Sequence, residues 1–411
     1  MTATTTSPRE PGEDGSPRAR SGPAAVLLHG LRTNMRQYGM LIALAFIVVL
    51  FQIWTDGALL LPNNVSNLIQ QNSYILILAM GMMLVIIAGH IDLSVGSVVA
   101  FVGALAAVMM VDHNLPWPVA FGLSLLVGAV IGAWQGFWVA YVGIPAFIVT
   151  LAGMLLFRGA TQIVLDGRSK APFPQGFQDI AQGFVPEMGP YTQYHNPTLL
   201  LGLGVAVLLV LREWRDRRRQ LAYTLDPLPF RLWVLKLVAM VAAVAAFSMT
   251  LASFHGVPVV LLIMCALLLG LGFAMRNAVA GRHIYALGGN RAAAVLSGVK
   301  DRRVTFLVFV TMGVLAALAG CVYAARLNAA TPQAGTMFEL EAIAACFIGG
   351  ASMSGGVGTV FGAVIGGLVL GVLNNGMSLV GVGTDWQQVI KGLVLLAAVG
   401  FDVWNKRRTG S

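Results

Sequence analysis

The sequence predicts an all-α fold, a polytopic bundle of about 10–12 membrane-spanning helices with both termini in the cytoplasm. Of the 411 residues, 57% are hydrophobic and only 10% are charged, whereas soluble chains carry about 25% charged residues. Apolar runs recur along the chain, and most are long enough to cross a hydrocarbon core of about 30 Å as helices. Lysine and arginine gather between alternate runs, which is the pattern that orients a membrane protein.

The first 30 residues differ from the rest, and we expect them to form a disordered cytoplasmic tail over 1–30. They are rich in Thr, Ser, Pro, Gly and Arg and contain too little apolar material to order themselves. A signal peptide needs an apolar core nearer the start than Ala24 to Leu28, and that stretch is too short. We therefore expect the transmembrane domain over 31–405.

The apolar runs predict twelve helical segments that cross or partly cross the membrane. They lie near residues 38–54, 73–89, 93–111, 117–142, 145–165, 197–211, 232–252, 257–275, 304–325, 339–350, 357–380 and 387–404. The segment 339–350 is too short to cross alone, so it is either re-entrant or part of a broken helix that continues through Gly355-Gly356. An even number of crossings places both termini on one side.

The distribution of positive charge gives the orientation. Of the 26 lysines and arginines, 20 fall in 1–37, in 212–231, in 276–303 and in 406–408, which are all cytoplasmic in this topology. The net charge of +9 is therefore explained by membrane orientation, and we expect no nucleic-acid partner. The three cysteines have no metal-ligand spacing and are interpreted as small apolar side chains.

Two sets of glycines spaced four residues apart predict close helix packing. Gly128, Gly132 and Gly136 form one set, and Gly358, Gly362 and Gly366 form the other. Each set gives one face of a helix a flat stripe that a neighbouring backbone can approach.

A polar, basic segment, GRHIYALGGNRAAAVLSGVKDRR at 281–303, interrupts the apolar runs. Its arginines and lysine keep it out of hydrocarbon. The run from Arg291 to Ser297 predicts a short helix, with Asn290 as N-cap and Gly298 just past its C-terminus. Gly288-Gly289 is expected to allow a sharp turn before that helix. The pattern predicts a small cytoplasmic docking helix between two spans.

This segment, G-R-x-I-Y-A-x-G-G-N-x-x-A-A-x-L-S-G, resembles the coupling segment of the membrane permeases of bacterial ATP-binding-cassette (ABC) sugar importers of the ribose and xylose type. The resemblance implies that 276–303 docks onto a separate ATPase subunit. The coupling residues that it implies are Gly281, Arg282, Tyr285, Gly288, Gly289, Asn290, Ala293, Leu296, Ser297 and Gly298.

The likeness covers most of residues 60–405. GMMLVIIAGHIDLSVG, which begins at Gly81, is similar to the second and third spans of the family. The blocks that begin at Ala133 and Ile144 are similar to the next part, and the stretch from Glu339 to Met377 is similar to the C-terminal part. The resemblance implies a homodimer in the bacterial plasma (inner) membrane that is surrounded by lipid and served by an extracytoplasmic sugar-binding protein.

An extra pair of spans separates this chain from the ribose type. Residues 197–252, with the basic loop REWRDRRRQ, intervene between the outer loop and the docking segment. The insertion resembles the xylose subgroup, which implies D-xylose as the transported sugar. The layout leaves other monosaccharides open.

A route for a neutral sugar needs amides, hydroxyls and aromatic edges within the membrane. The candidates for the substrate path are Asp92, Trp134, Gln135, Glu341, Asn374 and Asn375. Each has a structural alternative: Asp92 with Ser94 caps the following helix, and the others form hydrogen bonds between helices.

We expect no catalytic activity, metal or cofactor in this chain. None of its five lysines is followed by Ser or Thr, so the P-loop G-x-x-x-x-G-K-[ST] is absent. ATP is expected to bind the partner ATPase. The alternatives are a secondary sugar transporter coupled to ions, which usually needs intramembrane carboxylates or broken-helix carbonyls, and a membrane receptor without transport.

Overall fold

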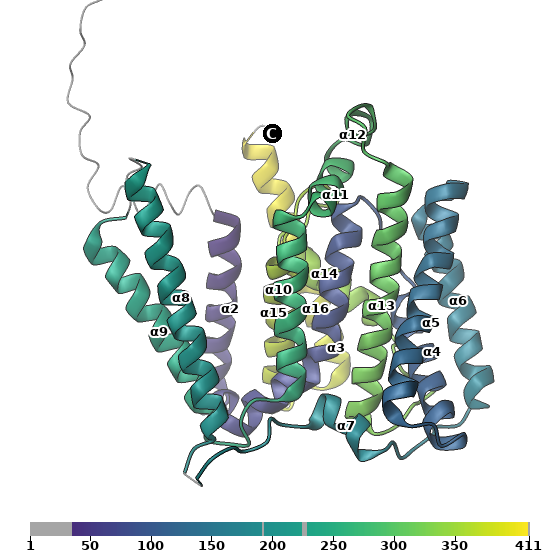
Figure 1. Ribbon diagram of the computed structural model, residues 1–411, viewed down its shortest axis with the longest axis horizontal. Coiled ribbons are helices and arrows are strands. Elements are labelled where there is room, and N and C mark those ends of the chain that lie inside the picture. Colours follow the sequence, from purple (N-terminus) through teal and green to yellow (C-terminus); the bar gives the residue numbers. More distant parts are fainter. Residues whose placement is uncertain (1–34, 191–192, 224–227, 410–411) are drawn as a thin grey trace, which may run out of the picture.

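The structure is a computed structural model that describes residues 35–190, 193–223 and 228–409. Every regular element in those ranges is a helix, and the only β-type pairings are the isolated bridges Lys170–Ala330 and Phe184–Pro258. The predicted all-α bundle is confirmed (Figure 1). The predicted tail 1–30 lies outside the described residues.

The helices follow the predicted apolar runs. They are α2 (Met35–Trp54), η1 (Ala58–Leu60), α3 (Pro62–Ile87), α4 (Val95–Ala107) with η2 (Val108–Asp112), α5 (Trp117–Phe137) with η3 (Trp138–Val142), α6 (Ala146–Leu165), α7 (Gln175–Gln182), α8 (Asn196–Ala222), α9 (Phe230–Ala252), α10 (Val259–Asn277), α11 (Val279–Gly289), α12 (Arg291–Leu296), α13 (Asp301–Leu327), α14 (Phe338–Ile348), α15 (Val360–Leu379) and α16 (Thr384–Thr409).

Within the described ranges, nine helices are long and apolar enough to cross a membrane. They are α3, α4 with η2, α5 with η3, α6, α8, α9, α10, α13 and α15. α2 and α16 run alongside them, and the start of α2 and the end of α16 lie at the same end of the bundle as α12 (Figure 1). We name this the docking end, and the opposite end, which carries α7, the α7 end.

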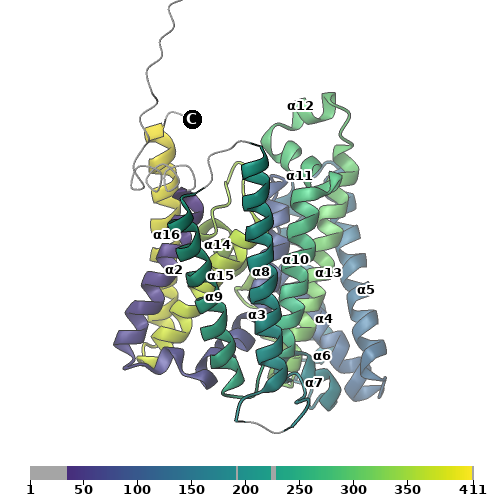
Figure 2. The ribbon, with the colours of Figure 1, turned by 60° about the vertical axis from the view of Figure 1, so that its left-hand side comes forward.

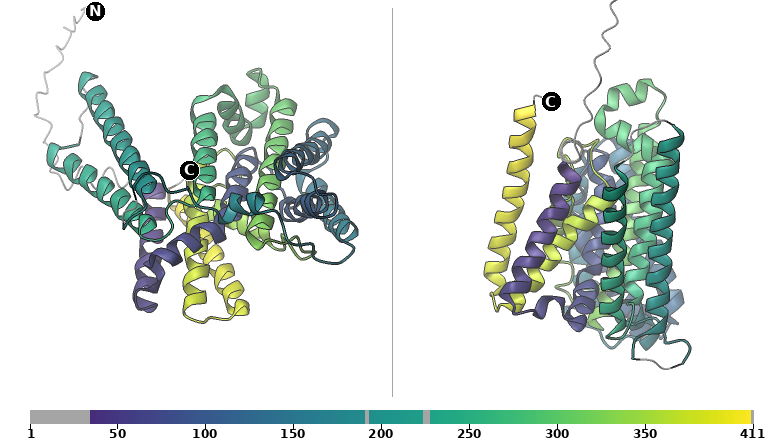
Figure 3. Two further views of the ribbon diagram at one scale, coloured as in Figure 1. Left: turned by 60° about the horizontal axis from the view of Figure 1, so that its bottom comes forward. Right: turned by 90° about the vertical axis from the view of Figure 1, so that its left-hand side faces the viewer.

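The core lies around α3, α13 and α15. The side chains of α3 from Ile75 to Ile87 are almost all buried, because α13, α14 and α15 pack around them. α4, α5 and α6 cover one side of this centre, while α2 and α16 lie on another (Figures 2 and 3). α8 and α9 pack against each other and diverge from the bundle toward the docking end (Figure 1).

The helices differ from the prediction most clearly in three places. α3 begins at Pro62 rather than near residue 73, because proline suits the first turn of a helix and polar residues then continue it. α8 extends beyond residue 211 to Ala222, so the basic stretch is helical rather than a loop. The outer loop 166–196 contains α7, whose Phe177 is fully buried.

The first glycine stripe packs as predicted. A methyl group on Gly128 or Gly132 would overlap the backbone of α13, at Gly313 and Phe309 respectively. The second stripe is only partly helical, because Gly358 lies before α15 with a φ of 153°. Gly362 of that stripe lies against the backbone of Gly349, which follows α14.

Candidate functional site

Two breaks in the helical structure, between α3 and α4 and between α13 and α14, lie close together. α3 ends at Ile87, and the connector 88–94, in which Asp92 and Ser94 are buried, leads to α4 at Val95. In the same way, 328–337 runs inward from the α7 end before α14 begins at Phe338. Non-helical backbone inside a membrane bundle is stable only where it is buried in protein or lines a cavity, and in many transporters it marks the binding site.

The two breaks meet inside the bundle, at a place that we name the junction. A methyl group on Gly96, in the first turn of α4, would overlap the carbonyl oxygen of Gly335 and the carboxylate of Glu339. Gly335 has a φ of 68°, which glycine adopts readily. The start of α4 and the connector that leads into α14 therefore face each other at backbone distance.

A chain of buried hydrogen bonds organises the first break. Ser94 donates to Oδ1 of Asp92 from its backbone N–H (2.8 Å) and from its hydroxyl (2.6 Å). Gln135 on α5 donates to the Ser94 hydroxyl at 2.7 Å. Asp92 and Gln135 are each 2% exposed and Ser94 is fully buried, so these predicted path residues lie together, with Asp92 closing the turn that leads into α4.

Two charged residues outside the predicted path, Arg158 and Glu339, lie at the second break. Arg158 on α6 donates to the carbonyl oxygen of Ala334 at 2.5 Å. The Oε2 atom of Glu339 is buried and has no hydrogen-bond partner among the described residues. A buried acceptor without a partner is costly, so the junction retains capacity to accept a hydrogen bond.

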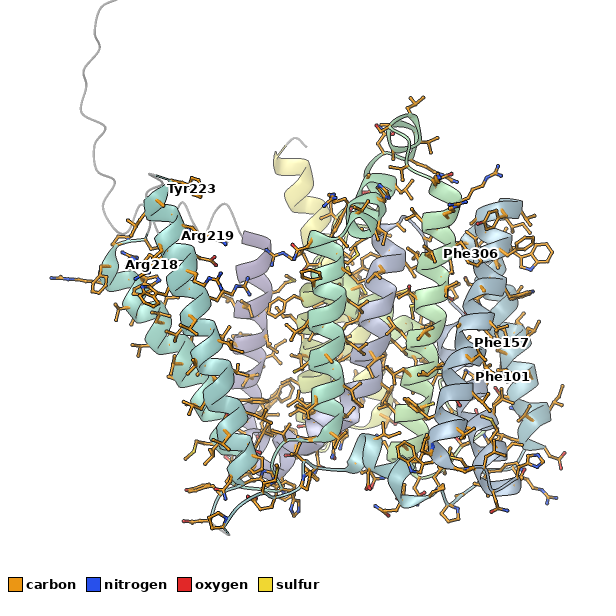
Figure 4. The ribbon with its side chains drawn as sticks, in the orientation of Figure 1. Phe101, Phe157, Arg218, Arg219, Tyr223 and Phe306 are labelled. Carbon is orange, nitrogen blue, oxygen red and sulfur yellow. The ribbon has the colours of Figure 1, made fainter. Side chains whose placement is uncertain are left out.

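The other predicted path residues lie elsewhere. Trp134 is 38% exposed and packs edge-on against Phe157 on α6, with ring centres 6.2 Å apart, while Phe157 also contacts Phe101 (Figure 4). Asn375 on α15 exchanges hydrogen bonds of 2.8 and 3.1 Å with Asn64 on α3. Within the described ranges, Oδ1 of the neighbouring Asn374 is buried without a partner.

Glu341 faces away from Glu339, into a groove between α14, α15 and α16. Its carboxylate pairs with the ammonium of Lys391 on α16 at 2.7 Å. The groove has a volume of about 370 Å³ and also contains Thr336 and Gln388. The two glutamates of α14 therefore serve different surfaces.

The docking segment forms the helix and the caps that were predicted. The Asn290 side chain accepts a hydrogen bond of 3.0 Å from the N–H of Ala293. Gly298 has a φ of 88°, and the bonds from Gly298 to Val295 (2.9 Å) and from Val299 to Ala294 (3.1 Å) complete a Schellman ending. Ala293 is exposed and Leu296 is 90% exposed, whereas Ala294 is buried.

The remaining coupling residues fix α11 and α12 in place. Gly281 lies against the backbone of Met275, and Arg282 donates to the carbonyl of Asn277 at 3.2 Å. The Ser297 hydroxyl donates to the carbonyl of Ala293 at 2.9 Å. Gly288 and Gly289 close α11 as helical residues, so the expected glycine turn is wrong: the chain turns at Asn290, whose backbone is extended.

Gly288 instead allows α11 to lie directly against two backbone segments. A methyl group there would overlap the carbonyl oxygen of Ile87 and the amide nitrogen of Gly356. Gly356 also donates to that Ile87 carbonyl at 2.9 Å, and the Tyr285 hydroxyl donates to the carbonyl of Gly358 at 2.7 Å. α11 therefore touches the end of α3 and the loop 349–359 that follows α14.

A cavity of about 620 Å³ lies beside the docking segment. Its lining includes His90, Tyr141 and Arg302, and also the ion pair between Arg291 and Asp301, whose atoms are 2.8 Å apart. Burial and then the charge of Arg291 lower the pKa of His90, so its ring is neutral at pH 7. The cavity has the size of a small-molecule site and opens next to the connector that leads to Asp92.

A double-mutant cycle tests the pair between Glu341 and Lys391. We expect Lys391→Met and Glu341→Gln each to lower the thermal stability of the purified protein, because each leaves one charge in the groove without its partner. The double variant should recover part of the loss, with a coupling energy of about 1 kcal/mol. Additive losses would show that the two groups do not stabilise each other.

Comparisons with known proteins agree with this architecture. Residues 64–399 match the family described as the branched-chain amino acid transport system / permease component. The xylose transport system permease protein XylH of Haemophilus influenzae is 41% identical over 377 residues, which is 91% of this chain and 98% of that protein. The Escherichia coli protein of the same name is also 41% identical, over 92% of this chain and 95% of its own length.

A second group of relatives is more distant. The ribose import permease protein RbsC of Haemophilus influenzae is 35% identical over 82% of this chain and 84% of that protein. No solved structure matches the chain significantly. The family match and the relatives confirm the resemblance drawn from the motifs, and this chain therefore belongs to the family of branched-chain amino acid transport system permease components.

Proposed function

We propose that this chain is the membrane subunit of an ABC importer that carries D-xylose into the cell. The observation that carries the choice of sugar is the extent of the similarity. Permeases named for xylose match over 98% and 95% of their length, and a permease named for ribose matches over 84%. The alignment with the xylose permeases leaves almost no part of those proteins without a counterpart here.

The junction is the part of the bundle best suited to pass a sugar. Gln135 and Ser94 offer neutral polar groups, and Glu339 offers an acceptor that is not yet used. A sugar hydroxyl that donates to Glu339 would remove the cost of the unpaired acceptor. In this proposal the sugar passes from the α7 end, through the junction, to the cavity beside His90.

The docking segment provides the connection to the energy source. The exposed face of α12, with Ala293 and Leu296, fits a groove on a separate ATPase subunit, which binds the ATP. A periplasmic or surface-tethered sugar-binding protein would deliver the sugar at the α7 end, and a second copy of this chain would complete the transporter. The family supports an ABC partner set over ion coupling.

Uptake in membrane vesicles tests this proposal. Vesicles that contain the chain, its ATPase and the binding protein should take up labelled D-xylose when ATP is supplied and the ion gradients are collapsed. Unlabelled ribose in excess should compete weakly and unlabelled xylose strongly. Uptake that needs an ion gradient instead of ATP would contradict the ABC mechanism. Strong competition by ribose and weak competition by xylose would contradict the choice of D-xylose.

Ala293→Glu tests the docking face. Residue 293 is the third helical position after the Asn290 cap, where glutamate favours helix formation, so α12 should stay folded. A charge on the apolar face should clash with an ATPase groove and be buried without a partner. We expect normal membrane abundance, loss of ATPase co-purification and uptake reduced at least tenfold, whereas Ala293→Ser should behave as wild type. Normal uptake with glutamate would exclude this face as the coupling surface.

A further inference from the structure

The α8–α9 hairpin carries a strongly basic surface that the proposed transport function does not use. Arg218, Arg219 and Tyr223 lie at its docking end, on the side of the molecule away from α12 (Figure 4). Between Arg212 and Lys236 the sequence holds seven basic and three acidic residues. This end of the hairpin also diverges from the bundle (Figure 3), so the surrounding membrane rather than the rest of the chain is its main neighbour.

Local acidic residues neutralise only part of this charge. Glu213 pairs with Lys236 at 2.7 Å, and Asp216 lies 4.0 Å from Arg212. Arg215, Arg218 and Arg219 are exposed and have no acidic partner among the described residues. Three permanent positive charges therefore point outward from two turns of one helix.

Helix length places these charges at the depth of lipid headgroups. The uncharged part of α8 from Pro197 to Leu211 spans about 22 Å at 1.5 Å per residue. This is shorter than a hydrocarbon core of about 30 Å, so the bilayer must thin locally or the first arginines must reach up to the interface. Either adjustment puts the arginines next to phosphates rather than in bulk water.

Aromatic rings hold two of the arginines at this level. The Arg217 guanidinium lies 4.8 Å from the centre of the Trp233 ring, and the Arg218 guanidinium lies 4.1 Å from that of Trp214. Arg217 donates to the carbonyl of Leu228 at 2.9 Å, whereas stacking leaves the N–H groups at the edge of the Arg218 guanidinium free to bind anions. Tryptophan and tyrosine are also the residues that anchor helices at the headgroup level, and Tyr223 is 75% exposed there.

We propose that this surface, formed by Arg212, Arg215, Arg218, Arg219 and Arg231 with Trp214 and Tyr223, binds the headgroups of anionic phospholipids. The need to orient the protein in the membrane explains positive charge at this end of the hairpin. It does not explain why arginines are stacked on aromatic rings at the depth of the phosphates. Charge complementarity favours anionic lipid over the zwitterionic kind, because each basic residue near an anionic surface adds several-fold to the binding constant.

Lipid selectivity of the full-length protein tests the proposal. Spin-labelled phosphatidylglycerol and phosphatidylcholine are compared in bilayers of phosphatidylcholine that contain the protein. We expect wild type to prefer phosphatidylglycerol, and 0.5 M salt to weaken the preference. Arg215→Gln/Arg218→Gln/Arg219→Gln should reduce it by roughly tenfold or more, whereas the same three positions changed to lysine should retain most of it.

A matched variant and a mapping experiment complete the test. Lys300→Gln/Arg302→Gln/Arg303→Gln removes the same charge at the same end of the bundle and should leave the preference unchanged. Photoreactive phosphatidylglycerol applied to wild type should crosslink to peptides within 212–231, which tests the site even if the glutamine variant does not fold. The proposal is overturned if wild type shows no preference, if both triple variants lose it equally, or if the crosslinks lie elsewhere.

Discussion

The structure depends on one backbone contact, in which Gly288 of α11 lies directly against the end of α3 and the loop after α14. No side chain fits between these segments, because a methyl group on Gly288 would overlap both the Ile87 carbonyl and the Gly356 amide. The bond from Gly356 to Ile87 at 2.9 Å ties the two segments to each other. Since packed backbone does not deform continuously, a shift of α11 has to move both.

The contact is important because the end of α3 and the loop 349–359 each connect to a helix that begins at the junction. Ile87 is followed by the connector to Asp92 and α4, and loop 349–359 follows α14, so each segment adjoins one of the two helices whose starts meet near Gly96 and Gly335. The docking segment is thus connected by backbone to the place where the connectors 88–94 and 328–337 lead to helix starts that lie against each other. A two-state movement of such a connection is a physical basis for coupling between distant sites.

Much of this could be predicted from the sequence where the signal is local. Asn290 and Gly298 bound α12 because capping depends on neighbouring residues, and the apolar runs predict the helices by length. The junction, by contrast, could be located only from the tertiary fold. Glu339 and Arg158 are charged residues within apolar runs, which in the sequence is a sign of a functional position. Only the fold shows that both reach the connector before α14. Trp134 and Gln135 are adjacent in sequence, yet Gln135 is buried and bonds to Ser94 whereas Trp134 is 38% exposed. The glycine at 288 serves close packing rather than a turn.

Coupled uptake in proteoliposomes, with the two neighbouring glycines of α11 compared, tests whether the Gly288 contact transmits movement from the docking segment to the junction. Gly288→Ala introduces a methyl group into the contact, whereas a methyl group on Gly289 meets no atom within 4 Å, so Gly289→Ala is the matched control. Both variants should insert and bind the ATPase, because the α12 face is unchanged. We expect Gly288→Ala to lose at least tenfold in uptake for each ATP hydrolysed, while Gly289→Ala transports as wild type. Normal coupling in Gly288→Ala would contradict this role of the contact.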